Sequence, residues 1–127
     1  MFKPMTSAMS RRKFEAMVAS AVTALPERIR KEIKNVAFVL DDRSDGRLLG
    51  HYHGIPNTRR STGYFWVLPD KITIFRRVIE AEAESSGEPL EKVVRRVVWH
   101  EIGHYFGYDE KGIRRLERKW EKSGRLG

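Results

Sequence analysis

The chain has 127 residues, which is enough for one domain with a modest hydrophobic core, and its 40% hydrophobic and 33% charged content is typical of a soluble globular protein. It contains no cysteine, which excludes disulfides and thiolate metal sites, so any metal must be bound by nitrogen and oxygen atoms. The net charge of +8 could suit a nucleic-acid partner, but the basic residues are scattered and form no recognised nucleic-acid-binding motif, so we interpret most of them as solvated.

The N-terminal part predicts a short tail followed by a helix. Residues 1–9 lack hydrophobic periodicity, so we expect a flexible tail in front of a single domain over residues 10–127. Ser10 is a suitable cap for the helix. The apolar side chains that recur at helical spacing are Phe14, Met17, Val18, Ala21, Val22 and Leu25.

The same stretch bears on where the protein is located. Arg11-Arg12-Lys13 in front of a weakly apolar run superficially resembles a twin-arginine export signal, but Glu15 stands where such signals are apolar. No apolar run is long enough to span a bilayer. Together with the absence of cysteine, these observations predict a cytoplasmic protein that does not enter a membrane.

Residues 26–40 predict a short helix followed by a strand. Pro26 suits the first position of a helix over residues 27–34. Residues 36–40 are a short, fully apolar run, which is typical of a buried strand. The acidic, turn-forming residues 41–46 end this strand.

A further strand is predicted over residues 48–54, which glycines bracket. His51 and His53 alternate along it, so both side chains lie on the same face of the strand. Two such histidines can hold a metal, but no carboxylate lies in phase with them. We therefore interpret them as exposed or hydrogen-bonded, with substrate contact by this strand as a further option.

The next segment predicts two strands and a helical turn. Residues 64–68 and 71–76 flank Pro69-Asp70 and look like two strands around a tight connection, after a loop over residues 55–63. Residues 79–84 predict a brief helical turn, which the following Ser-Ser-Gly sequence ends.

A long amphipathic helix is predicted after Pro89. The apolar residues at helical spacing are Leu90, Val93, Val94, Val97, Val98, Ile102, Tyr105 and Phe106. His100 and His104 fall on the same row as Val93 and Val97, which faces the core. Ionisable groups on an apolar arc need partners, and a metal ion would supply them.

The helix carries the pattern H-E-x-x-H. Two histidines four residues apart lie about 40° apart around a helix and about 6 Å apart along its axis, so both imidazoles can reach one ion. Glu101 lies on the adjoining face, where it can reach a water held by that ion. This spacing predicts a zinc site in which His100 and His104 are ligands and Glu101 is the general base of a hydrolysis reaction.

A turn after the helix offers a third ligand. Gly107 stands where a helix would end with a left-handed residue, and such a turn can bring Glu110 back towards the two histidines. We expect Glu110 to be the third ligand, with Asp109 as the main competitor, because either residue could instead cap the next helix. The apolar stripe Ile113, Leu116 and Trp120 predicts that this last helix packs on the core.

With these segments in view, the chain resembles a family of minimal zincin-like metallopeptidases. The histidine motif at positions 100–107 is shared by many zincins, and the more specific likeness lies in the middle of the chain. The segments that carry it are Arg12-Lys13-Phe14-Glu15, Ala24-Leu25-Pro26, Leu48-Leu49-Gly50-His51-Tyr52-His53-Gly54-Ile55-Pro56 and Leu68-Pro69-Asp70-Lys71-Ile72-Thr73-Ile74-Phe75-Arg76.

The resemblance implies a compact α+β fold with a small mixed sheet beside the active-site helix and helices at both ends. It implies one Zn²⁺ ion bound by His100, His104 and an acidic residue, with Glu101 as the base. Two departures from related metzincins matter. Their third ligand is commonly His or Asp whereas position 110 is Glu, and this chain has no methionine after Met17 to build a methionine turn, so another element, such as the final helix, must form the floor of the site.

We therefore predict a zinc metallopeptidase that acts on a peptide or protein substrate. A candidate to assist the reaction as an oxyanion donor is one of Tyr64, Tyr105 and Tyr108. One alternative is a zinc-binding adaptor domain without catalysis. A second alternative, which the scattered basic residues do not favour, is a nucleic-acid-binding domain with structural histidines.

Overall fold

The computed structural model describes residues 8–43, 46–54 and 68–126. The predicted loop at 55–63, residues 64–67 of a predicted strand and most of the predicted tail lie outside these ranges. The elements are α1 (Ala8–Thr23), α2 (Glu27–Glu32), β1 (Val36–Asp41), β2 (Gly50–His53), β3 (Asp70–Phe75), α4 (Arg76–Ser86), α5 (Leu90–Tyr105) and α6 (Glu110–Leu126). The first helix thus begins two residues before the predicted cap at Ser10.

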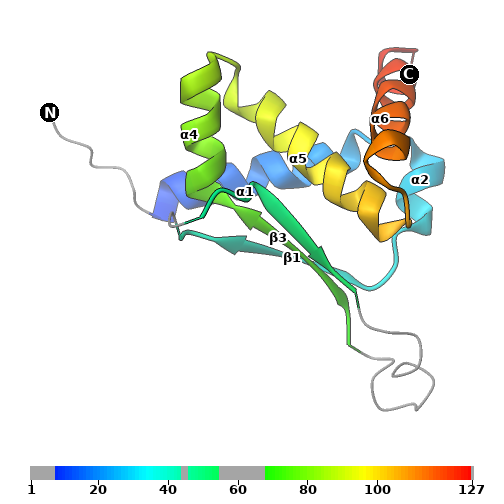
Figure 1. Cartoon of the computed structure of the whole chain (residues 1–127), viewed down its shortest axis with the longest axis horizontal. Coiled ribbons are helices and arrows are strands. Elements are labelled where there is room, and N and C mark those ends of the chain that lie inside the picture. Colours follow the sequence, from blue (N-terminus) through cyan, green and yellow to red (C-terminus); the bar gives the residue numbers. More distant parts are fainter. Residues whose placement is uncertain (1–7, 44–45, 55–67, 127) are drawn as a thin grey trace, which may run out of the picture.

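The three described strands form a mixed sheet in the order β1-β3-β2. β1 pairs with β3 in parallel, with Val36 opposite Asp70, and β2 pairs with β3 antiparallel, with Gly50 opposite Ile74. The helices lie on one side of the sheet, with α5 across it and α4 and α6 at the two ends of α5 (Figure 1). The predicted α+β fold with a small mixed sheet beside a central helix is confirmed.

The hydrophobic core lies between α5, α1 and the sheet. The fully buried side chains include Phe14 of α1, Ile72 and Ile74 of β3, and Val93, Val94, Val98 and Ile102 of α5. Trp99 is also buried, and its indole Nε1 donates a hydrogen bond of 2.8 Å to the carbonyl oxygen of Ala21. This bond joins α5 to α1, and burial of so many apolar groups holds α5 in a fixed orientation.

Two elements differ from their predictions. The strand predicted at 36–40 is present as β1, but its expected burial is wrong, because β1 is an edge strand of the described sheet whose side chains are partly exposed, with Val39 at 39%. The brief turn expected at 79–84 is a full helix. It begins at Arg76, directly after β3, and ends at Gly87, which has a left-handed φ of 79°.

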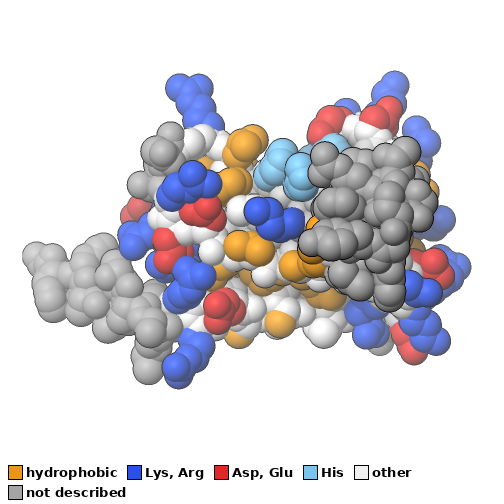
Figure 2. Space-filling model, turned by 90° about the horizontal axis from the view of Figure 1, so that it is seen from below, with side chains coloured by type: hydrophobic (Ala, Val, Ile, Leu, Met, Phe, Trp, Pro, Cys, Tyr) orange, Lys and Arg blue, Asp and Glu red, His pale blue; other side chains and the backbone are white. Residues whose placement is uncertain are grey.

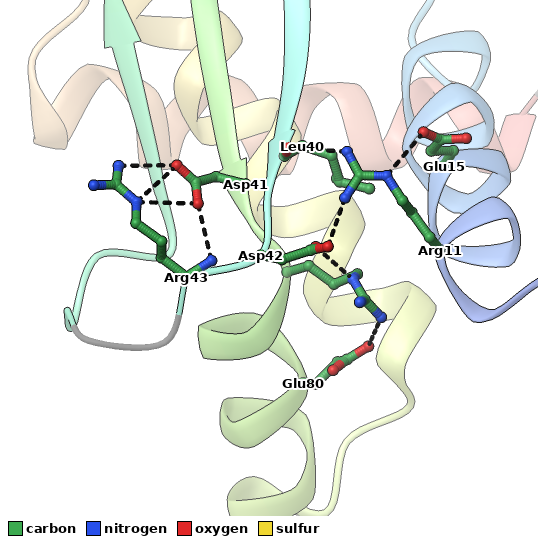
Figure 3. A network of polar contacts seen from close by, with 8 residues as sticks. Arg11, Glu15, Leu40, Asp41, Asp42, Arg43 and Glu80 are labelled. Atoms are coloured by element: carbon green, nitrogen blue, oxygen red, sulfur yellow. Dashed lines mark hydrogen bonds and ion pairs between the residues drawn. The ribbon is translucent and has the colours of Figure 1, made fainter. Parts of the chain in front are cut away.

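A polar network holds α1, α4 and the end of β1 together (Figure 3). Arg76 is 3% exposed, and its Nε donates to Asp42 Oδ1 at 2.8 Å while its Nη1 donates to Glu80 at 3.3 Å. Arg11 of α1 donates to the other oxygen of Asp42 at 2.7 Å. Asp42 therefore bridges two guanidinium groups, and the hydrogen bond from Arg76 holds the pKa of Asp42 below its ordinary value.

Replacing Asp42 with Asn should destabilise the protein in a pH-dependent way. Asp42 has a lowered pKa in the folded state, so its contribution to stability is present above the ordinary Asp pKa and is lost as pH falls through the lowered value. We expect a loss of about 1–2 kcal/mol at pH 7, less than for a buried pair because the Asp42 side chain is 41% exposed. Urea unfolding should show the difference shrinking as pH falls below about 4, the ordinary pKa of Asp.

Glu84→Gln on the exposed side of α4 is the matched control, and it should leave stability unchanged at both pH values. A destabilisation of Asp42→Asn that persists unchanged in acid would show that the charge of Asp42 does not carry the effect.

Candidate metal centre

The end of α5 places the two histidines of the motif side by side. The rings of His100 and His104 lie one helical turn apart, with centroids separated by 4.9 Å. The helix ends as predicted at Gly107, which has a φ of 89°. The amide of Gly107 donates to the His104 carbonyl at 2.9 Å and the amide of Tyr108 donates to the Gly103 carbonyl at 3.1 Å, which is a Schellman motif.

The turn assigns different positions to the two acidic residues that follow. Asp109 caps α6, because its Oδ1 accepts a hydrogen bond of 2.9 Å from the amide of Gly112. Glu110 points back to α5, with carboxylate oxygens 3.2 Å from the Nε2 atoms of both His100 and His104. Of the two candidates for a third ligand, the structure therefore brings Glu110 to the histidines and leaves Asp109 on the helix end.

The donor atoms of this cluster fit a zinc ion. One atom each from His100, His104 and Glu110 lies within 4.8 Å of the others, and they form the one such group found among the described residues. Neighbouring ligand atoms of a tetrahedral zinc ion bonded at about 2.0–2.1 Å are roughly 3.3 Å apart, close to the 3.2 Å between the Glu110 carboxylate and Nε2 of each histidine. Two imidazoles and one carboxylate also leave the fourth position open.

Close packing between α5 and α6 fixes Glu110 relative to the histidines. A Cβ atom added to Gly103 would lie 2.6 Å from Cγ1 of Ile113, so only glycine lets α6 approach this closely. Ile113 and Trp120 are buried, and Trp120 packs edge-to-face on Trp99 with the ring centroids 5.8 Å apart. The predicted docking of the last helix through its apolar stripe is confirmed.

Glu101 lies beside the cluster on the side of β2. It is 6% exposed, and a Cβ atom added to Gly50 would lie 3.3 Å from its Oε2, so the glycine leaves room for the carboxyl group. Burial raises the pKa of Glu101, while the nearby His100, His104 and His51 act in the opposite direction. A carboxylate with a raised pKa is a stronger base than an exposed one.

A cavity of about 520 Å³ adjoins these residues. His100, Glu101 and Glu110 line it together with the segment Leu48 to Gly50, and the side chains of Arg47, Arg96 and Arg114 form part of its wall. The cluster is therefore accessible to a molecule larger than water.

The remaining candidates occupy other positions. His51 and His53 are exposed on β2 and belong to no metal-binding group among the described residues. The hydroxyl of Tyr105, a predicted oxyanion donor, instead bonds to the backbone amide and carbonyl of Lys34 at 3.1 Å, and Tyr108 is 46% exposed. Tyr64 lies outside the described residues.

Glu117 is a further residue near the site, which the motif pattern does not include. This carboxylate on α6 has its Oε2 3.8 Å from Nδ1 of His100, and burial raises its pKa. A signal was present, because Glu117 follows Glu110 by seven residues, or about two helical turns, and therefore shares a helix face with it. The final helix thus contributes to the surroundings of His100.

The surface shows how histidines and charges are distributed. Histidine side chains gather at one place on the face seen in Figure 2, whereas lysines and arginines are spread over it among acidic side chains.

No helix in the described part of the chain has the length and apolar character to cross a membrane.

Comparison with known proteins agrees with the geometry. A family model described as zincin-like metallopeptidase matches residues 17–120, which extend from α1 to α6 and include the whole cluster. A search of curated proteins found no match. The family implies a bound zinc ion, and the cluster of two histidines and a glutamate is a group able to hold it. The chain belongs to the zincin-like metallopeptidase family.

Proposed function

We propose that the protein is a zinc-dependent peptidase in which His100, His104 and Glu110 are the metal ligands and Glu101 is the general base. The observation that carries this proposal is the convergence of the three donor atoms next to a buried carboxylate. A zinc ion held by these residues would supply Lewis acidity to polarise a peptide carbonyl and would lower the pKa of a bound water to about 7.

Glu101 performs the proton transfers. Its carboxylate accepts a proton from the attacking water and then passes it to the nitrogen of the leaving amine. Packing against Gly50 keeps the group in place, and its burial excludes bulk water from one side. The same burial raises the pKa of Glu101, which strengthens it as a base.

The substrate would bind in an extended conformation along β2. β3 is not available for this purpose, because both of its edges are paired in the described sheet. β2 has one edge on β3 and no second partner among the described strands, and it lies directly against α5 at Glu101. A peptide that adds to this edge would pass the cavity beside the metal centre.

Zinc-dependent cleavage of a peptide library tests the proposal. The purified protein should cleave peptides, lose this activity with a chelator and regain it with zinc. Glu110→Gln should weaken zinc binding by more than about 100-fold, the upper end of the effect of losing an outer-shell partner. Asp109→Asn is the matched control, because Asn caps a helix as well as Asp and the donor set remains intact.

The outcomes separate the proposal from its alternatives. Loss of zinc affinity in Asp109→Asn but not in Glu110→Gln would overturn the ligand assignment. Stoichiometric zinc binding without cleavage of any peptide would indicate a zinc-binding adaptor instead of an enzyme.

A further inference from the structure

The two ring nitrogens of His100 face different carboxylates. Nε2 lies 3.2 Å from Glu110, on the side of the metal centre. Nδ1 lies on the other side of the ring, 3.8 Å from Oε2 of Glu117. A histidine that binds a metal through Nε2 carries its proton on Nδ1, and this N–H needs an acceptor to fix the tautomer and the ring orientation.

Glu117 has an acceptor oxygen that lacks a donor. Its Oε2 is enclosed by protein and accepts no hydrogen bond from any described residue. Arg96 is one of the basic side chains whose charge acts on Glu117, but Glu88 already binds both terminal nitrogens of its guanidinium at 3.0 and 2.8 Å. A buried acceptor without a donor costs free energy, so an unpaired oxygen at this position points to a donor that pairs with it in another state of the site.

The helix geometry keeps Glu117 in this position. Glu110, Ile113 and Glu117 follow one face of α6 at intervals of three and four residues. Ile113 is fully buried against Gly103, so the central contact of this face cannot shift. The two carboxylates are thereby held on opposite sides of the His100 ring.

We propose that Glu117 is a positioning residue, which accepts a hydrogen bond from Nδ1–H of His100 and orients Nε2 towards the metal. The inference rests on the proposed function in one respect, that His100 binds zinc through Nε2. A movement of the carboxylate by about 1 Å brings the 3.8 Å separation to hydrogen-bonding distance.

Zinc affinity and zinc-free stability together test this role. Glu117→Ala should weaken zinc binding by about 10–100-fold in competition with a chromophoric chelator. Glu117→Asp or Glu117→Gln, which keep an acceptor oxygen, should recover part of the affinity. The unfolding midpoint of the zinc-free Glu117→Gln protein should equal or exceed that of the wild type, because a charged group whose Oε2 is enclosed without a donor is replaced by a neutral amide.

A spectroscopic readout reports on the bond itself. In the zinc-loaded wild type, the Nδ1 proton of His100 should give a resolved, slowly exchanging NMR signal, and Glu117→Ala should shift or remove it. Glu121→Gln is the matched control, since Glu121 is one turn further along α6 and pairs with Arg95. It should change neither the zinc affinity nor the signal.

Each outcome decides the question. Equal zinc affinity of Glu117→Ala and wild type would overturn the positioning role, and so would a fall in zinc-free stability that accounts for the affinity loss. Failure of the wild type to bind zinc would overturn the proposed metal centre as well. Zinc binding without peptide cleavage would leave this inference standing while the proposed activity fails.

Discussion

Glu101→Gln is expected to lower kcat/KM for peptide hydrolysis by about 10²–10⁴-fold, the contribution of a positioned general base. Gln has nearly the same shape as Glu, so it should fit the space against Gly50, but it cannot accept the proton of the attacking water. Glu101 is not one of the three converging donors, so zinc binding should remain stoichiometric. Steady-state kinetics and a zinc titration of the same preparation provide the measurement.

Glu91→Gln serves as the control for this variant. Glu91 is an exposed residue in the first turn of the same helix, and its replacement should leave both turnover and zinc binding unchanged. Undiminished hydrolysis by Glu101→Gln would remove the assignment of the base, even if the metal centre itself were correct.

The second large effect is expected from adding one methyl group at Gly103. Alanine in place of glycine within a helix usually stabilises by about 1 kcal/mol. Here the new Cβ would lie 2.6 Å from Cγ1 of the fully buried Ile113, and such overpacking costs about 1–3 kcal/mol. Gly103→Ala should therefore destabilise the protein in urea unfolding. It should also weaken zinc binding, because a shift of α6 that relieves the clash would carry Glu110 away from the histidines.

A double-mutant cycle identifies the cause of the destabilisation. Ile113→Ala alone should cost about 2–5 kcal/mol, but in the Gly103→Ala background its cost should be smaller, because it removes the clash. Gly46→Ala, where no atom lies within 4 Å of the added Cβ, is the control for the substitution itself. Strict additivity of Gly103→Ala and Ile113→Ala would contradict the packing explanation.

The parts predicted well from sequence are those that local spacing determines. The interval between His100 and His104 fixes their relative position once the segment is helical, and Gly107 ends the helix wherever its neighbours place it. Glu110 follows at a short, fixed distance after that turn. The sequence alone does not decide between Glu110 and Asp109 as the third ligand. The structure shows that Asp109 instead accepts a hydrogen bond from the amide of Gly112.

The parts that were missed depend on what packs against them. An apolar run such as residues 36–40 suits a central or an edge strand equally, and only the sheet order shows that β1 lies at an edge. Arginine is usually exposed, yet Arg76 is buried because Asp42, 34 residues away in the sequence, pairs with it. The position of Glu117 beside His100 depends on how α6 packs against α5, which the sequence does not show.

The Schellman turn between α5 and α6 has a consequence for how the centre assembles. All three converging side chains lie between positions 100 and 110, so they meet through contacts of low sequence separation, and closing so short a segment costs little loop entropy. The parallel pairing of Val36 with Asp70 must instead close a segment three times as long or more. The ligand geometry of this helical hairpin therefore depends mainly on local contacts, and in the proposed binding mode the sheet would form the wall along which a substrate lies.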